Sequence, residues 1–420
     1  MTPLQLTHFT ASSCLGHGLD ATLAALRAHK TGLAPCTFET VTDLVTHIGE
    51  VAAVDQMSLP AALASFDCRN NRLAWLGLQQ DGFSDAVEAA IARHGCRRVG
   101  VLLGTSTSGI LQTEQAYRRR DPGCLDSSGG ALPGDFHYRT THNTYSVADF
   151  VRSHFKLEGP AVVVSTACSS SAKVFASAAR MIAAGLIDAA IVGGVDSLCL
   201  TTLYGFNSLE LLSPEPCRPF DAARKGISIG EAAAFILLER PAGNLDADAV
   251  LLLGTGESSD AHHMSSPHPE GLGARMAMAA ALKAAGLCAA DIDYINLHGT
   301  ATPSNDAAEG RAVATLFGDA VPCSSTKGAT GHTLGAAGGL EAIISALALQ
   351  QGFMPGGVNT RQLDPGIPIH YLTANQDIAL KDSDPLGAKT PVESYAPRRV
   401  LSNAFGFGGT NCSLILGRAQ

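Results

Sequence analysis

The sequence has few charged residues and lacks a paired-cysteine motif. Charged residues make up 16% of the 420 positions, and 29 Lys and Arg against 38 Asp and Glu give a formal net charge of −9. This balance argues against general binding to nucleic acid. The 11 cysteines are scattered without a CxxC pair, so neither a disulfide framework nor a structural zinc site is expected.

Long apolar runs and targeting signals are also missing. No window approaches 18 uninterrupted apolar residues, so no membrane span is expected. The first residues, MTPLQLTHFTASSCLG, have neither the basic segment nor the continuous apolar segment of a signal peptide. We therefore expect a cytoplasmic protein with reduced cysteines.

Apolar runs of strand length alternate with Ala-rich helical patterns along the chain, which predicts an α/β fold around a central sheet. Hydrophobic residues make up 46% of the chain, enough for a sizeable core. Strands are expected within residues 98–109, 161–165, 189–198, 232–240, 250–260 and 291–302.

A weak internal sequence repeat suggests two related halves. AVVVSTACSSSAKVFASAARMIAAG (161–185) and VPCSSTKGATGHTLGAAGGLEAIISALALQQG (321–352) both combine a strand, a turn of small residues and an Ala-rich helix. Their continuations, GLIDAAIVGG and GFMPGGVN, also look alike. We predict a duplicated α/β unit, with an N-terminal half at 1–245, a C-terminal half at 246–420 and the two turns close together.

Cys168 lies at the predicted turn between a strand and a helix. A helix N-terminus carries free N–H groups and roughly half a positive charge, which favours a thiolate. The sequence therefore predicts a lowered thiol pKa and a nucleophile at Cys168. The alternative is a buried cysteine that packs among small residues.

Three further stretches carry candidate chemistry. INLHGTATPSND places His298 after a strand, and SSTKGATGHTLGAAGGLE contains Lys327, His332 and Glu341. One cysteine with two histidines on separate strand–loop units favours a nucleophilic site, although each histidine could be structural and Lys327 could be exposed. The third stretch, LSNAFGFGGTNCSLIL, lacks the spacing of a phosphate cradle, so we expect a tight turn whose N–H groups stabilise an oxyanion.

A histidine-rich stretch, SSDAHHMSSPHPEG, contains His262, His263 and His268. Adjacent histidines point in different directions, and no carboxylate or cysteine completes a ligand set. We predict no metal site, and expect a loop that lines an entrance.

Together, TACSSS, HGTATPSND, KGATGHTLGAAGG and FGFGGTN resemble β-ketoacyl-acyl-carrier-protein synthases of the thiolase superfamily, of the KAS I/II type, in order and approximate spacing. CRPFDAARKGISIGEAAAFILLER (217–240) is similar to the segment that this family carries between its cysteine and first histidine. The resemblance covers nearly the whole chain. It implies a thiolase fold, with two pseudo-symmetric βαβαβαββ halves in a five-layer α-β-α-β-α arrangement.

The resemblance also implies a reaction, the decarboxylative Claisen condensation of an acyl group with malonyl carrier protein. Cys168 would hold the acyl group, and its N–H and that of Phe407 would form the oxyanion hole. His298 and His332 would bind the malonyl thioester carbonyl, supported by a Lys327 and Glu341 pair.

Substrate contacts are implied in the same way. Thr300 and Thr302 would contact the phosphopantetheine arm, which arrives on the carrier protein, so no bound cofactor is expected. Phe405 and Phe407 would line and gate the acyl pocket, and Thr107 would reach across a dimer interface to the partner's pocket. Asn305, where the family commonly has Gly, and SSSAKV after the nucleophile leave fatty-acid and aryl-polyene or polyketide synthesis both open.

The implied partners are acyl carrier protein and a second subunit, either a copy of this chain or a chain-length-factor-like protein. Because carrier proteins are acidic and this chain is net negative, docking would need a local basic patch. The candidates, each of which could instead be ordinary solvated surface, are Arg69, Arg72, Arg118, Arg119, Arg120, Arg224 and Lys225.

Three other functions share some of these features. A thiolase acting on coenzyme A esters would need a second catalytic cysteine, for which Cys412 is the nearby candidate, although its strand setting favours packing. A non-catalytic chain-length subunit usually lacks the cysteine that Cys168 supplies. A cysteine hydrolase would leave His332 and Lys327 without a role.

Overall fold

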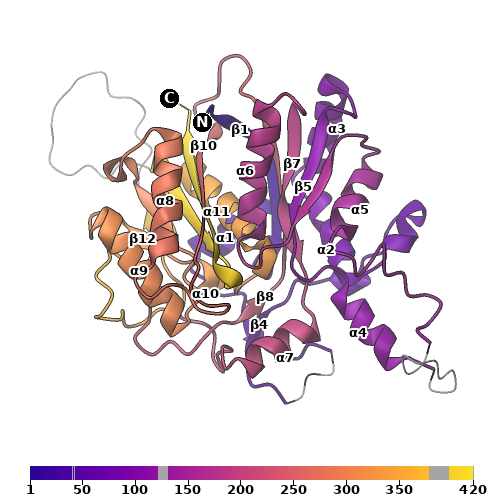
Figure 1. The fold of residues 1–420 in the computed structure, drawn as a ribbon, viewed down its shortest axis with the longest axis horizontal. Coiled ribbons are helices and arrows are strands. Elements are labelled where there is room, and N and C mark those ends of the chain that lie inside the picture. Colours follow the sequence, from indigo (N-terminus) through magenta and orange to yellow (C-terminus); the bar gives the residue numbers. More distant parts are fainter. Residues whose placement is uncertain (40, 42, 122–130, 378–396, 420) are drawn as a thin grey trace.

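A mixed sheet runs through the centre of the computed structural model, which describes residues 1–39, 41, 43–121, 131–377 and 397–419 (Figure 1). The sheet has 11 strands in the order β12-β11-β15-β16-β10-β1-β9-β7-β5-β6, with β2 (Gly16–His17) paired to β1. The N-terminal strands are β1 (Leu4–Ser13), β5 (Val99–Gly104), β6 (Ala161–Val164), β7 (Ala189–Asp196) and β9 (Ala232–Glu239). The C-terminal strands are β10 (Val250–Ser259), β11 (Tyr294–Asn296), β12 (Cys323–Ser324), β15 (Arg399–Phe405) and β16 (Thr410–Arg418).

The two halves repeat one topology. Numbered by chain order within its own half, each set of strands lies in the order 3-2-4-5-1. In both halves the second strand pairs in parallel with the third and fourth, and the last pairs antiparallel with the fourth and first. This repeat is the predicted pseudo-symmetry. The halves join where Leu4–Leu6 of β1 pairs with 250–252 of β10.

Helices form three layers around the sheet strands (Figure 1). The central layer holds α6 (Ser170–Ala183) and α11 (Ala337–Gln351). The outer layers are α2 (Arg69–Leu78), α3 (Phe83–His94) and α5 (Ser146–His154) on the N-terminal strands, and α8 (Leu272–Ala285) and α9 (Pro303–Phe317) on the C-terminal strands. The expected five-layer thiolase-type arrangement is thus the one observed.

The sequence explains why α11 occupies the middle. Its residues 337–349, AGGLEAIISALAL, are almost all apolar or small, and all are buried. A helix that is apolar on every side requires cover on every side. Gly338 lets α6 approach, because a Cβ there would lie 2.7 Å from the Cβ of Ala172.

Shorter elements connect these layers. They are α1 (Gly18–Arg27), β3 (Ala34–Pro35), β4 (His47–Gly49), α4 (Ile110–Arg118), α7 (Leu200–Ser208), β8 (Ile229–Gly230), α10 (Lys327–Thr330), β13 (Phe353–Met354) and β14 (Gln376–Asp377). Short 3-10 turns lie at Val54–Gln56, Ala61–Phe66, Ala289–Asp291, Leu334–Ala336 and Phe407–Gly409. In the described part of the chain, no helix combines the length and apolar character needed to cross a bilayer.

One part of the predicted internal repeat, the match of GFMPGGVN to GLIDAAIVGG, is wrong. The repeat does relate β6 and α6 to β12 and α11. However, the C-terminal counterpart of β7 is β15 (Arg399–Phe405), whereas GFMPGGVN contains β13, which pairs with β14 outside the main sheet. An excursion between α11 and β15 separates the repeated elements, and similarity of short Gly-rich segments could not reveal it.

Candidate active site

Cys168 lies in a tight turn between β6 and α6. Ala167, just before it, has a φ of 52°, in the left-handed region that costs a non-glycine residue energy. The Ser170 side chain holds this turn, because its Oγ donates to the Ala167 carbonyl at 2.6 Å and accepts the Thr166 N–H at 2.9 Å. The Cys168 side chain therefore has a fixed direction into the protein, where it is 4% exposed.

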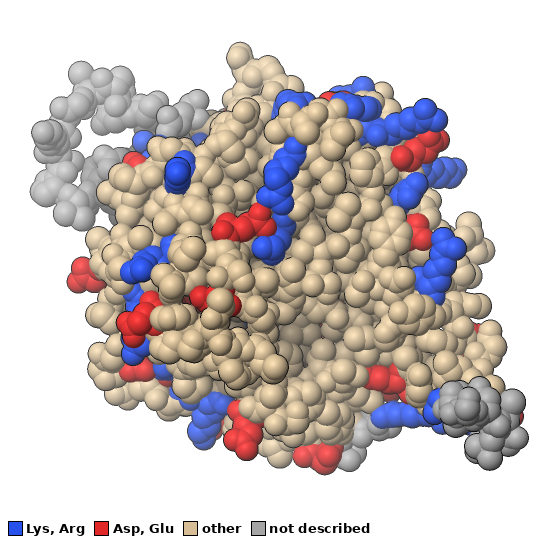
Figure 2. All heavy atoms as spheres, viewed as in Figure 1, with Lys and Arg blue, Asp and Glu red and all other residues tan. Residues whose placement is uncertain are grey.

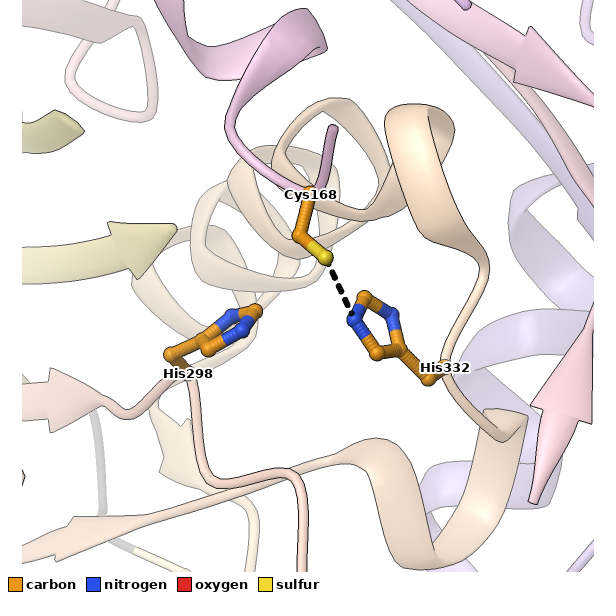
Figure 3. Close-up of side chains that lie close together, drawn as sticks. All are labelled: Cys168, His298 and His332. Carbon is orange, nitrogen blue, oxygen red and sulfur yellow. Dashed lines mark hydrogen bonds between the residues drawn. The ribbon is translucent and has the colours of Figure 1, made fainter. Parts of the chain in front are cut away.

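Two histidines from the C-terminal half meet this cysteine (Figure 3). The Cys168 Sγ lies 3.0 Å from the His332 Nε2. The rings of His298 and His332 are 5.3 Å apart and nearly perpendicular. The predicted meeting of Cys168, His298 and His332 is thus what the structure shows, and all three are buried.

The backbone around His332 fixes both the position and the tautomer of its ring. The His332 N–H donates to the Ser228 carbonyl at 2.7 Å, and the Gly230 N–H donates to the His332 carbonyl at 3.0 Å. The Leu334 N–H donates to Nδ1 at 3.2 Å. Since Nδ1 is an acceptor, the proton of the neutral ring is on Nε2, which points at the cysteine.

Lys327 fixes the position and the tautomer of the His298 ring. Its ammonium group donates to the His298 carbonyl at 2.6 Å, lies 3.3 Å from His298 Nδ1 and pairs with Glu341. Burial, followed by the Lys327 charge, holds the pKa of both histidines well below the ordinary 6.5. Both rings are therefore neutral and present Nε2–H groups to the site.

The same contacts disfavour a metal. The ligand atoms of Cys168, His298 and His332 lie within 4.8 Å of one another, a spacing that a soft metal ion could accept. A metal-binding histidine usually donates its other ring N–H to an acceptor. Here each Nδ1 faces a donor, so Nε2 carries the proton and offers no lone pair to a metal.

The prediction of a lowered Cys168 pKa is wrong. Burial raises the pKa of this thiol from 9.0 to about 11, although the Phe407 N–H, the Lys327 charge and its own N–H oppose the rise. The sulfur is enclosed, and α6 begins only at Ser170, so the loss of water outweighs the helix field. The two N–H groups that lower this pKa are those of the expected oxyanion hole.

A pocket opens from this centre and encloses about 590 Å³, its mouth included. The predicted substrate contacts Thr300, Thr302, Phe405 and Phe407 all line it. His263 lines it too, as expected for an entrance loop, while His262 lies against His268 with ring centres 5.2 Å apart. Sequence reasoning missed Phe206, whose ring packs 5.7 Å from that of Phe407.

Glu309 is a second residue of the site that sequence reasoning missed. Its carboxylate accepts the His298 N–H at 2.8 Å, the Gly299 N–H at 2.7 Å and the Asn403 side-chain N–H at 3.1 Å. Burial raises its pKa to about 7. The signal was present, because Glu309 shares a helical face with the buried Ala312 and Val313.

Asp196, at the end of β7, was missed as well. It accepts N–H groups from Ser106 and Thr107 of one loop and, at 2.5 Å, from Gly335 beside the His332 segment. Thr107 is buried in its own subunit, with its hydroxyl 2.9 Å from Asp196. Its predicted reach into a partner's pocket needs a second chain and stays a prediction.

Two of the seven docking candidates are unsuited to docking. Arg69 is 1% exposed and pairs with Glu50, Asp55 and Glu231. The Arg224 side chain is 7% exposed and pairs with Asp364 at 2.6 Å. Arg69 thus neutralises the buried Glu231, and Arg224 also lies 3.7 Å from the buried Asp306.

The other candidates lie at the surface to different degrees. The Arg72 side chain is 25% exposed and pairs with Asp67, and Arg119 pairs with Asp135. Lys225 is exposed. On the face in Figure 2, Lys and Arg lie at scattered points, with wide uncharged areas between them.

Two family profiles match the chain. They are described as the β-ketoacyl synthase N-terminal domain, over residues 60–243, and the β-ketoacyl synthase C-terminal domain, over residues 249–361. Together they cover well over half of the sequence. The match to each half agrees with the repeated topology.

Curated relatives and solved structures point the same way. The chain is 32% identical to 3-oxoacyl-[acyl-carrier-protein] synthase 2 of Coxiella burnetii over 98% of both chains. It is 38% identical to the mitochondrial 3-oxoacyl-[acyl-carrier-protein] synthase of Arabidopsis thaliana over 63% of this chain and 58% of that one. A ketosynthase solved with its chain length factor from Xenorhabdus doucetiae is 37% identical, with a TM-score of 0.85 over 100% of this chain and 98% of that chain.

The fold and the buried cysteine between two histidine N–H groups define an acyltransferase of the thiolase fold. Within that class, the profile matches and the relatives settle the family. The chain belongs to the β-ketoacyl synthase family.

Proposed function

We propose that this protein extends an acyl chain by decarboxylative condensation with malonyl carrier protein, using Cys168 as the nucleophile. Attack of Cys168 on an acyl carrier protein thioester forms a new thioester and releases the carrier thiol with the proton from Cys168. The Cys168 and Phe407 N–H groups, both of which lower the pKa of the Cys168 thiol, stabilise the oxyanion that forms.

The second half-reaction uses the histidines. Nε2–H groups of His298 and His332 donate to the malonyl thioester carbonyl, so that loss of CO2 leaves a stabilised enolate. The enolate carbon attacks the Cys168 thioester, forms the C–C bond and releases the cysteine. One observation carries this function, the Cys168 sulfur 3.0 Å from a neutral His332 whose Nε2 is the donor.

A polyketide-type or polyene-type pathway is the more specific proposal. Two ketosynthase and chain-length-factor structures, 37% and 26% identical to this chain, match it over its whole length. β6 is apolar, half-buried and last in the sheet order, and no strand among the described residues pairs with its outer edge, so that edge is available to a second subunit. We propose that a chain-length-factor-like subunit covers it, with a second copy of this chain and fatty-acid synthesis as the alternative.

Other features follow from the same proposal. The halves 1–245 and 246–420 are its structural units, and the site is in the cytoplasm, where carrier proteins supply the phosphopantetheine. Thr300 and Thr302, with hydroxyls 2.9 Å apart at the pocket wall, contact that arm. Phe405 and Phe407 shape the acyl end of the pocket.

The test is intact mass after incubation with carrier proteins that bear short saturated, long saturated or aryl-polyenoyl chains. We expect an acyl adduct on the wild type and none on Cys168→Ala. The preferred chain distinguishes fatty-acid from polyene synthesis, and co-purification with a second subunit identifies the partner. Acylation only from coenzyme A esters would contradict the proposal and favour a thiolase, in which Cys412→Ala should then abolish turnover.

A further inference from the structure

The two N–H groups of the expected oxyanion hole, those of Cys168 and Phe407, come from distant parts of the chain. Cys168 belongs to the turn 166–169, in the N-terminal half, and Phe407 to the turn 406–410, in the C-terminal half. An oxyanion hole works only when both donors reach one oxygen atom. The spacing of the two turns therefore needs a physical support.

Three hydroxyl groups join the turns. The Ser169 Oγ lies 3.2 Å from the Thr410 Oγ1, which lies 3.1 Å from the Thr166 carbonyl oxygen. The Thr166 Oγ1 lies 3.1 Å from the Ser169 Oγ. The first turn thus contributes two hydroxyls, one on each side of Cys168, and the second turn contributes the hydroxyl of Thr410, three residues after Phe407.

One arrangement of protons satisfies all three hydroxyls. Thr166 donates to Ser169, Ser169 donates to Thr410, and Thr410 donates to the Thr166 carbonyl. Each hydroxyl has one proton to give and lone pairs to accept another. The Ser169 Oγ also lies 3.0 Å from the Thr166 carbonyl oxygen, so Ser169 keeps a partner within its own turn. Thr410 takes part in both hydrogen bonds that cross between the turns, so removal of its hydroxyl breaks both of them.

The packing leaves little room for these turns to shift. Ser169 is fully buried. A Cβ at Gly406 would lie 2.6 Å from the Thr166 carbonyl oxygen, so glycine is what permits the close approach. The Gly406 N–H in turn donates to the Thr410 carbonyl at 2.7 Å, which folds the second turn around Phe407.

We propose that Thr166, Ser169 and Thr410 form a hydroxyl clamp that positions the Cys168 and Phe407 N–H groups for acyl transfer. These are positioning residues, because they act through the backbone on either side of the donors. The inference rests on the proposed function. It makes a specific claim, that the clamp serves acylation of Cys168 and not malonyl decarboxylation, which uses the histidines.

The experiment compares Thr410→Val, which keeps the shape and removes the hydroxyl, with Thr410→Ser, which keeps the hydroxyl. Thr315→Val, at an exposed position of α9 whose hydroxyl donates to the Arg311 carbonyl of the same helix at 2.7 Å, is the matched control. Single-turnover acylation from acyl carrier protein is followed by intact mass. CO2 release from malonyl carrier protein without primer is measured on the same samples.

We expect Thr410→Val to slow acylation by about tenfold or more, since donor misplacement by a fraction of an ångström is costly. CO2 release should stay within about twofold of wild type, and Thr410→Ser should restore acylation. Ser169→Ala combined with Thr410→Val should be no slower than the worse single variant, because Thr410→Val alone already removes both hydrogen bonds between the turns.

Other results would overturn the clamp. Thr410→Val acylated at the wild-type rate would show that the hydroxyl clamp does not position the two N–H donors. Equal losses of acylation and CO2 release would indicate a general structural role. If the wild type itself is not acylated by any carrier protein, the proposed function fails and not the clamp alone.

Discussion

The pH dependence of Cys168 reactivity separates two physical effects that act in opposite directions. A helix N-terminus would lower the thiol pKa, whereas burial raises it from 9.0 to about 11. The rise corresponds to a thiolate destabilised by on the order of 3 kcal/mol. At pH 7, roughly one Cys168 in ten thousand is then ionised, about a hundredfold fewer than for an unburied thiol.

The assay is alkylation by iodoacetamide between pH 6 and 11. Peptide mapping by mass spectrometry isolates the peptide that contains Cys168 from those of the other cysteines, and a small free thiol in the same tube gives the intrinsic rate. Because the thiolate reacts, we expect the rate to rise about tenfold per pH unit through pH 10. Limited access lowers the whole curve but leaves its slope unchanged.

Removal of the Lys327 charge gives a second test of the Cys168 pKa. That charge lowers the pKa of Cys168, so Lys327→Met should slow alkylation further at every pH below 10. Lys283→Met, an exposed position in the last turn of α8, is the control for loss of one positive charge. A wild-type rate that levels off below pH 8 would refute the argument from burial and restore the helix field as the dominant effect.

Three further substitutions test the framework around the site. Glu309→Gln tests one buried carboxyl group. The pKa of Glu309 in the folded protein is about 7, above the ordinary 4.5. The contribution of this group to the stability of the fold is therefore greatest below pH 4.5 and is lost as the pH rises to 7. The wild-type free energy of unfolding should therefore fall over that range by up to roughly 3 kcal/mol relative to the variant, and parallel pH curves would contradict this. Arg69→Met leaves Glu231 as an unpaired buried charge and should destabilise the fold by about 3–5 kcal/mol in urea, whereas a wild-type midpoint would show that the pair is dispensable. Gly338→Ala should cost roughly 1–3 kcal/mol because of the Ala172 contact, while Gly205→Ala, with open space around its Cβ, should not destabilise; equal effects would refute the packing argument.

Sequence reasoning was most successful where chemistry follows from local pattern. The pattern of strand, small-residue turn and helix predicted Cys168 in the turn after β6, and the similar pattern in the second half predicted that His298 and His332 lie near it. The burial of Lys327 could not be decided from its neighbours, because an exposed lysine fits the same Gly-rich turn. Its resemblance-based pairing with Glu341 is what the structure shows.

The features that sequence missed depend on contacts between distant segments. Arg69 looks like a surface arginine until Glu231, 162 residues away, meets it. Asp196 joins two loops whose approach only the folded sheet decides. The Cys168 pKa belongs to this group too, since the local helix field is visible in sequence but the enclosure that opposes it is not.

The raised pKa of Cys168 limits the ways in which the thiolate needed for acylation can form. His332 is the nearest basic group, yet its Nε2 carries the proton and its pKa is well below 6.5, so it is a poor acceptor for the thiol proton. The thiolate must instead be stabilised by the His332 Nε2–H, by the backbone N–H groups of Cys168 and Phe407, and by the Lys327 charge. As an acyl carbonyl enters, its developing oxyanion takes over the two backbone N–H groups, so the negative charge moves from sulfur to oxygen next to the same two donors. Because neither histidine has to accept the thiol proton, both can remain neutral donors for the malonyl half-reaction.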